Sequence, residues 1–130
     1  MVSWNNLDTL SSYKELADVK PACLTEVMSG DNGAERVKNY SIPMAAGLSY
    51  NYASKQVDEN VLAALEKLAD EAQLADKFKA LYNGEVVNTG EKRLVLHHMT
   101  RGQLGDAVEA DGVDKRTFYK TQQERIAEFA

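Results

Sequence analysis

Apolar residues recur at helical spacing in two adjoining stretches near the middle of the chain. Residues 58–72 carry apolar side chains at steps of three and four, with charged residues between them: Val61, Leu65, Leu68 and Ala72. This spacing predicts an amphipathic helix, and Asp58 and Glu59 at its start complement the helix dipole. Leu74, Phe78 and Leu81 predict a second helix directly afterwards. Asn83-Gly84 should end it, because glycine readily takes the left-handed conformation found at helix ends.

The N-terminal part of the chain predicts shorter elements. Apolar residues between 4 and 19 indicate a helix, which the Ser11-Ser12 pair interrupts and Pro21 closes. A short helix over residues 23–28 should end near the glycines of residues 30–33, and residues 34–40 should form another helical turn or two. Residues 48–52 alternate apolar with polar side chains, which is typical of a short strand.

The C-terminal part predicts two more helices separated by glycines. Asn88 and Glu91 have the spacing of a capping box, which predicts a helix over residues 92–101. Residues 108–113 should form a small extended turn with Asp111-Gly112 at its tip. Asp114 should open a last helix with Phe118, Ile126 and Phe129 on its apolar side. No stop signal follows at Ala130, so a natural terminal helix and a truncated one would look the same, and we expect truncation.

These elements predict a mostly α protein, a small helical domain of about five to six helices with one or two very short strands. The 130 residues suffice for one domain, and a hydrophobic content of 44% can fill a core. The net charge of −5 is spread without a basic stripe, which argues against nucleic-acid binding. The start of the chain lacks a signal peptide, and no stretch approaches the roughly 20 apolar residues of a membrane span. We therefore expect a cytoplasmic protein.

The only cysteine, Cys23, cannot form an internal disulfide, which fits a reducing compartment. We interpret it as a small buried or half-buried apolar side chain rather than a reactive thiol. His97-His98 is the most conspicuous candidate for a metal site. Adjacent helix positions point about 100° apart, so the pair cannot chelate one ion by itself. We expect no metal and no other cofactor.

Three basic side chains form a better-defined set. Arg93, His97 and Arg101 are spaced by four residues and would share one face of the helix predicted over residues 92–101. Such a face could bind a carboxylate, a phosphate or a partner chain, or form internal salt bridges, and we favour the structural role. The glycine-rich residues 102–105 lack the features of a phosphate loop and are interpreted as a plain turn. No catalytic residue is predicted.

Three ordered motifs between residues 52 and 101 resemble the N-terminal region of the phosphoglucose isomerase family. Family members carry Tyr-Ser-Lys-Asn, then Asn-Gly-Glu-x-x-Asn, then Asn-x-Thr-Glu-x-Arg-x-Val-Leu-His-x-x-Leu-Arg. The matching stretches here are residues 52–56, 83–88 and 88–101. The spacing of Arg36 and Tyr40 also resembles an upstream arginine and aromatic pair. An extra Ala53, Gly90 in place of Thr and Thr100 in place of Leu suggest a divergent bacterial branch.

The resemblance implies an enzyme that interconverts glucose 6-phosphate and fructose 6-phosphate, with a glutamate that moves a proton through an enediol. In the family the phosphate loop and catalytic residues lie downstream, in two α/β sugar-isomerase sandwich domains. Residues 1–130 would then be one N-terminal helical segment that ends before these domains and is inactive alone. Its partners would be the rest of the polypeptide and a second subunit, and Arg93, His97 and Arg101 would make structural or interface contacts. The alternative is a free-standing helical module that binds a protein partner.

Overall fold

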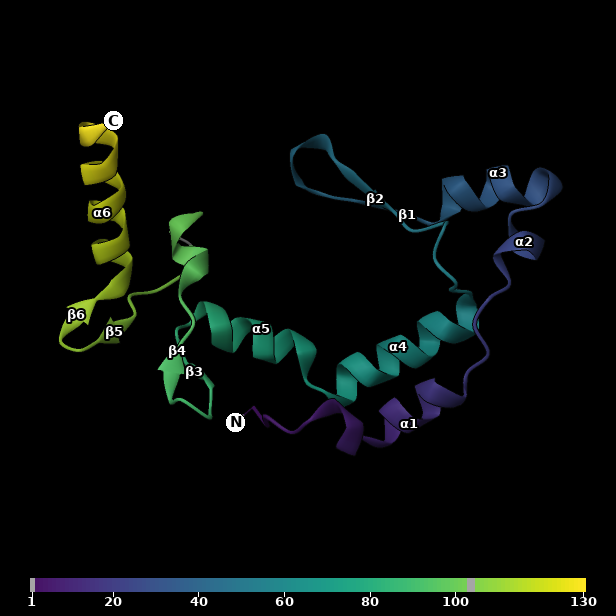
Figure 1. Ribbon diagram of the computed structural model, residues 1–130, viewed down its shortest axis with the longest axis horizontal. Helices are drawn as coiled ribbons and strands as arrows, with labels where there is room; N and C mark the ends of the chain where they lie inside the picture. Colours follow the sequence, from purple (N-terminus) through teal and green to yellow (C-terminus); the bar gives the residue numbers. More distant parts are fainter. Residues whose placement is uncertain (1, 103–104) are drawn as a thin grey trace. The chain divides into compact units, whose positions relative to one another are not determined.

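The computed structural model describes residues 2–102 and 105–130, which divide into two compact units. One unit is Leu7–Glu71, and the other joins Met1–Asn6 to Ala72–Ala130 (Figure 1). Helices predominate in both units, and each unit also contains at least one short antiparallel strand pair. The prediction of a mostly α fold is therefore confirmed. The prediction of one N-terminal segment that ends before larger domains stays a prediction.

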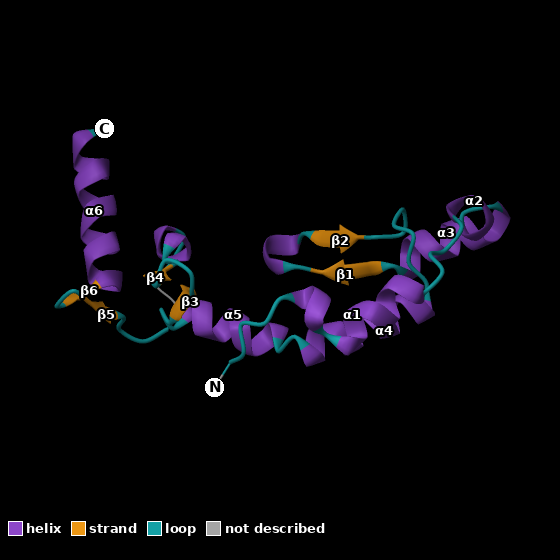
Figure 2. Ribbon diagram, turned by 60° about the horizontal axis from the view of Figure 1, so that its bottom comes forward, coloured by secondary structure: helices purple, strands orange, loops and turns teal. Residues whose placement is uncertain are grey.

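The unit Leu7–Glu71 contains four α-helices, two 3-10 turns and one strand pair. In chain order these are η1 (Leu7–Thr9), α1 (Ser11–Asp18), α2 (Leu24–Val27), α3 (Gly30–Asn39), β1 (Ser41–Pro43), η2 (Ala45–Gly47), β2 (Ser49–Asn51) and α4 (Glu59–Glu71). α1 packs along α4 (Figure 1). β1 and β2 form an antiparallel ribbon, which is drawn in orange in Figure 2.

The helix predicted over residues 58–72 is confirmed as α4, and Asp58 caps it by accepting a hydrogen bond from the Val61 N–H at 3.0 Å. Two neighbouring predictions were wrong. Ser11-Ser12 does not interrupt a helix but begins α1, because the Glu71 carboxylate accepts hydrogen bonds from both serine N–H groups. α3 begins at Gly30, where we expected a turn, since Gly33 packs against the backbone of Met28 and continues the helix.

The described residues of the other unit form two α-helices, a 3-10 turn and two short hairpins. Its elements are α5 (Leu74–Tyr82), β3 (Val86–Asn88), β4 (Arg93–Leu94), η3 (His97–Thr100), β5 (Glu109–Ala110), β6 (Val113–Asp114) and α6 (Lys115–Phe129). Its core is a cluster of Leu96, Met99 and Val108, with Leu94 and Tyr119 packed against it. The N-terminal residues are attached to this unit, because the Ser3 N–H donates to Gln73 Oε1 at 2.8 Å.

Three predicted boundaries in this unit are confirmed. Gly84 ends α5 with a left-handed φ of 71°, and a Cβ at this position would overlap Val108 Cγ1. Asp111 and Gly112, both with positive φ, form the tip of the β5–β6 hairpin. Asp114 then caps α6, accepting hydrogen bonds from the N–H groups of Arg116 and Thr117. A hydrogen bond from the Thr117 hydroxyl is the main cause that lowers the pKa of Asp114.

The helix predicted over residues 92–101 was wrong. Asn88 and Glu91 do interact, with the Glu91 N–H donating to Asn88 Oδ1 at 3.1 Å, but the pair closes the β3–β4 hairpin instead of starting a helix. Lys92 has a φ of 54°, a left-handed conformation that interrupts any helix at this point. Only His97–Thr100 forms a short 3-10 turn.

The apolar side of α6 has little cover within residues 2–102 and 105–130. Phe118, Ile126 and Phe129 are 46%, 68% and 95% exposed. Other residues of α6 hold the helix in place: Tyr119 packs against the core cluster, and Gln123 Nε2 donates to the Thr100 carbonyl of η3 at 2.6 Å. Across the residues described, no helix has both the length and the apolar character that spanning a membrane requires.

Candidate functional site

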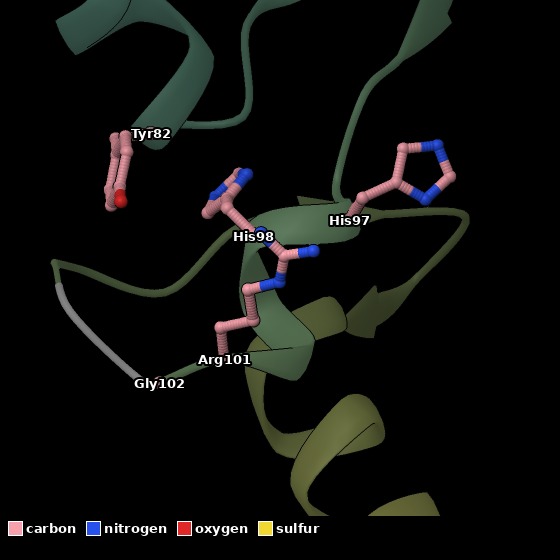
Figure 3. Close-up of a pocket in the computed structure, with 5 residues that line it drawn as sticks. All are labelled: Tyr82, His97, His98, Arg101 and Gly102. Atoms are coloured by element: carbon pink, nitrogen blue, oxygen red, sulfur yellow. The ribbon is translucent and has the colours of Figure 1, made fainter.

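A cavity of about 240 Å³ opens where α5 meets η3, within the unit that contains α6. It is lined by Tyr82 at the end of α5 and by four residues at or beside η3: His97, His98, Arg101 and Gly102. In Figure 3 the His98 ring extends toward Tyr82 and the Arg101 guanidinium lies beside the His98 side chain, whereas the His97 ring extends away from Tyr82. This cavity brings together two of the three basic residues singled out from the sequence.

His98 is the most constrained side chain of the cavity. Its ring packs on Tyr82 with the ring centroids 4.6 Å apart and the planes tilted by 31°. Burial lowers the pKa of His98, and the nearby positive charge of Arg116 lowers it further. Both causes disfavour the imidazolium, so His98 is the neutral form at physiological pH.

Arg116, near the start of α6, is hydrogen-bonded to Tyr82, one of the residues that line the cavity. It is 6% exposed, and its Nη2 donates to the Tyr82 carbonyl at 2.6 Å while its Nε donates to the Asp106 carbonyl. These bonds fix the end of α5 to the start of α6. Nothing in the sequence pattern marked Arg116, because an arginine on a polar helix is ordinarily read as a solvated side chain.

Two buried nitrogens remain without a hydrogen-bond partner among the residues described: His98 Nε2 and Arg116 Nη1. Both belong to side chains that contact Tyr82. Buried polar groups are nearly always hydrogen-bonded in native proteins. Of these two atoms, His98 Nε2 belongs to a residue that lines the cavity, whereas Arg116 is not among the lining residues.

The lining of the cavity limits its chemistry. Tyr82, His97, His98, Arg101 and Gly102 include no carboxylate, so the cavity has no acid–base pair of carboxylates. The residues described contain no group of three or more His, Cys, Asp or Glu side chains that could hold a metal ion. The arrangement is suited to hydrogen bonding and to contact with an anionic or polar surface.

Arg93, His97 and Arg101 do not share a helix face, contrary to the prediction. Arg93 lies in β4 and makes an exposed ion pair with Glu91, Nη1 to Oε2 at 3.6 Å. His97 lies in η3 and Arg101 follows it, and both line the cavity. The prediction failed because it depended on a helix through residue 92, where the backbone is left-handed. The plain turn predicted over residues 102–105 includes residues 103 and 104, which lie outside those described.

The Tyr52 motif and the upstream Arg36 meet in the unit Leu7–Glu71, in a structural role. Arg36 is 7% exposed and donates to the carbonyls of Ala53, Lys55 and Val57 at 2.9, 3.1 and 2.6 Å. Its guanidinium also lies 4.0 Å from the centroid of the Tyr40 ring. The chain at and after the Tyr52 motif therefore bends around the buried guanidinium of Arg36.

Tyr40 completes this arrangement at its edge. Its ring contacts Tyr52 with the centroids 5.1 Å apart, and its hydroxyl donates to Glu59 Oε1 at 3.1 Å. Burial raises the pKa of Tyr40, and the hydrogen bond and charge of Glu59 raise it further. The spacing of Arg36 and Tyr40 in the sequence is therefore explained by one contact between a guanidinium in the last turn of α3 and the ring of the residue that follows the helix.

Cys23 is exposed, so its interpretation as a buried apolar side chain was wrong. The residue stands just before α2, where its carbonyl accepts hydrogen bonds from the Glu26 and Val27 N–H groups. Its Sγ lies 3.1 Å from the Thr25 hydroxyl oxygen.

Comparison with known proteins agrees with the motifs. A sequence model of phosphoglucose isomerase matches residues 51–130. The chain is 42% identical to the glucose-6-phosphate isomerase of Treponema denticola over 134 aligned positions, which cover 99% of this chain and 26% of that protein. It is also 42% identical to the glucose-6-phosphate isomerase of Borreliella afzelii, covering 100% of this chain and 24% of the relative.

A more distant relative gives the same result. The chain is 37% identical to the glucose-6-phosphate isomerase of Shewanella woodyi over 82% of its length and 19% of the relative. The chain thus spans about a quarter or less of the length of these curated relatives, all of which come from bacteria. With the family model matching well over half of its residues, this chain belongs to the phosphoglucose isomerase family.

Proposed function

We propose that this chain is the N-terminal structural segment of a glucose-6-phosphate isomerase and is catalytically inactive alone. The parent enzyme would interconvert glucose 6-phosphate and fructose 6-phosphate. The observation that carries the proposal is the coverage: relatives with this name match 99–100% of the chain but only 24–26% of their own length. A free-standing protein-interaction module is not favoured, because it would not account for identity to these enzymes along the whole chain.

The chemistry of the cavity supports inactivity of the segment. Aldose–ketose isomerisation needs a carboxylate base beside the substrate and a cradle of donors for the phosphate. The lining supplies a neutral imidazole at His98 and a cation at Arg101, but no carboxylate. We assign the base and the phosphate cradle to a part of the enzyme outside residues 1–130.

Two further parts of the proposal concern contacts and location. Arg93, His97 and Arg101 would contact the rest of the polypeptide or a second subunit; His97 and Arg101 would do so at the cavity. The net charge of −5 gives no attraction to nucleic acid. We further propose that the enzyme acts in the cytoplasm without a cofactor.

The test is an isomerase assay on two proteins. One is the purified 130-residue chain, and the other is the longer product that the proposal predicts from the same gene. Fructose 6-phosphate formation is followed by a coupled assay at equal molar concentrations. We expect turnover by the longer product only. Robust turnover by the 130-residue chain would contradict the inactivity, and an inactive longer product would contradict the assignment to the enzyme.

A further inference from the structure

The ribbon formed by β1 and β2 is apolar on one face and polar on the other. Ile42 pairs with Tyr50 in the antiparallel register, so their side chains lie on the same face. Met44 and Leu48 continue that face, because the Met44 N–H donates to the Leu48 carbonyl at 2.8 Å. The four side chains are 52%, 48%, 56% and 65% exposed in the order Ile42, Tyr50, Met44 and Leu48.

The base of the ribbon is fixed by polar contacts. Asn51 Nδ2 donates to the Val37 carbonyl of α3 at 2.6 Å, and the Ala53 N–H donates to Asn51 Oδ1 at 3.1 Å. The Tyr52 N–H donates to the Tyr40 carbonyl at 2.9 Å. These hydrogen bonds join the base of the ribbon to α3 and to Tyr40 directly after it.

The apolar face of the ribbon and α4 enclose a groove of about 250 Å³. Ile42, Tyr50 and Tyr52 line it from the ribbon and its end, and Leu62 and Leu65 line it from α4. Lys55 is the single charged residue among those that line it. All of these residues belong to the unit Leu7–Glu71, so the groove is a feature of one compact body.

A ribbon of this kind is not expected to keep its shape in water alone. Two strands without further cover are marginally stable at best. Each large apolar side chain that becomes buried contributes roughly 1.5–3 kcal/mol, and here four of them are about half exposed or more. The groove and the ribbon face together are therefore a surface that needs an apolar partner.

We propose that an apolar segment of the same isomerase polypeptide, outside residues 1–130, occupies this groove and covers the ribbon. The inference rests on the proposed function, because relatives contain about three times as much chain beyond the matched part. A covalently attached segment has an effective concentration of roughly millimolar, which a separate molecule seldom reaches in a cell. A second copy of the chain is a poorer occupant, because two copies of net charge −5 repel each other.

The test is amide hydrogen exchange of residues 41–52 in the longer gene product and in the 130-residue chain. In the longer product we expect these amides to exchange slower by roughly tenfold or more. Ile42→Thr, which keeps strand propensity while removing apolar surface, should reduce that protection, as should Leu65→Asp on the other wall of the groove. Ser49→Asp is the matched control, because Ser49 is exposed on the polar face of the same ribbon and should leave the protection unchanged.

Each outcome bears on the inference separately from the proposed function. Equal exchange in the two proteins would overturn it, even if the longer product is an active isomerase. Protection that develops in the 130-residue chain as its concentration rises, together with a dimer by light scattering, would also overturn it and assign the groove to a second copy. Protection in an inactive longer product would support the groove assignment and contradict only the enzymatic one.

Discussion

The carboxylate of Glu71, the last residue of α4, accepts hydrogen bonds from both the N–H and the hydroxyl of Ser12 in the first turn of α1. The same carboxylate accepts hydrogen bonds from the N–H of Ser11 at 3.3 Å and its hydroxyl at 3.0 Å. Residue 10, at the N-cap of α1, is a leucine and makes no side-chain cap. Glu71 therefore performs for α1, from a distant point in the sequence, what a local Ser or Asp performs for most helices.

Low pH should weaken the cap that the Glu71 carboxylate forms on α1. The hydrogen bonds from Ser12, and then those from Ser11, lower the pKa of Glu71 to about 2 from an ordinary 4.5. Because the folded state holds the ionised form, the stabilisation is complete above pH 4.5 and is lost as the pH falls toward 2. Thermal unfolding measured at pH 7 and at a series of lower pH values should show that Glu71→Gln has a lower Tm than the parent at pH 7 and a smaller decrease in Tm on acidification. Glu66→Gln, which removes a charge from an exposed position on the same helix, is the control.

Gly84 and Gly112 form a matched pair that can measure how much steric overlap of an added Cβ atom destabilises the fold. Both have a φ of 71°, but a Cβ on Gly84 would overlap Val108, whereas a Cβ on Gly112 meets nothing within 4 Å. Replacing either glycine by alanine should lower the free energy of unfolding by roughly 1 kcal/mol through backbone strain. Gly84→Ala should lower it by about 1–3 kcal/mol more, because the added Cβ overpacks against Val108. Urea unfolding measures both; equal losses would contradict the close packing of Val108 on the end of α5.

Arg36→Lys should destabilise the unit Leu7–Glu71 despite keeping the positive charge. A lysine ammonium cannot reproduce the planar guanidinium that donates to the carbonyls of Ala53, Lys55 and Val57. Leaving buried carbonyls without donors should cost about 2 kcal/mol or more. Arg93→Lys is the control, since the exposed pair of Arg93 with Glu91 should contribute at most about 1 kcal/mol. Urea unfolding of the two variants gives the comparison.

His98 should titrate below the ordinary histidine range. Burial and the charge of Arg116 lower its pKa from 6.5, so the folded state favours the neutral ring. The contribution of this group to stability is complete above pH 6.5 and decreases as the pH falls below it. NMR titration of the His98 ring protons should give a midpoint below that of the same ring in urea-unfolded chain. A midpoint equal to or above the unfolded one would contradict the packing on Tyr82.

Sequence reasoning succeeded where one stretch of chain determines its own structure. The helices α4, α5 and α6 were predicted because apolar spacing, the caps Asp58 and Asp114 and the stop at Gly84 are all local signals. The β5–β6 hairpin followed from Asp111-Gly112, which has the positive φ that tight hairpins require. In each case the residues that determine the element lie within it or next to it.

It failed where two structures share the same local signal. Asn88 and Glu91 would interact in much the same way at a helix start and in the β3–β4 turn, and only the left-handed Lys92 distinguishes the two. The candidate set of Arg93, His97 and Arg101 was lost with that helix, although His97 and Arg101 remained neighbours at the cavity.

The buried contacts that hold each unit together were not predictable from spacing. Arg116 donates to carbonyls 10 and 34 residues away, and Glu71 reaches Ser12 across 59 residues. Such bonds depend on how distant elements pack together, and this packing cannot be inferred from the local patterns of a single sequence. Arg36 was noticed only through the family resemblance, and its three carbonyl acceptors could not have been named.

The bond between the Ser3 N–H and Gln73 places the first residues of the chain in the unit that also contains its last helix. Lys77 Nζ, 5.6 Å from the centroid of the Trp4 ring, belongs to the same attachment. A single cut of the gene before residue 72 therefore separates these residues from the body to which they are fastened. Anyone who dissects this protein should either fuse residues 2–6 to the later piece or supply them as a peptide.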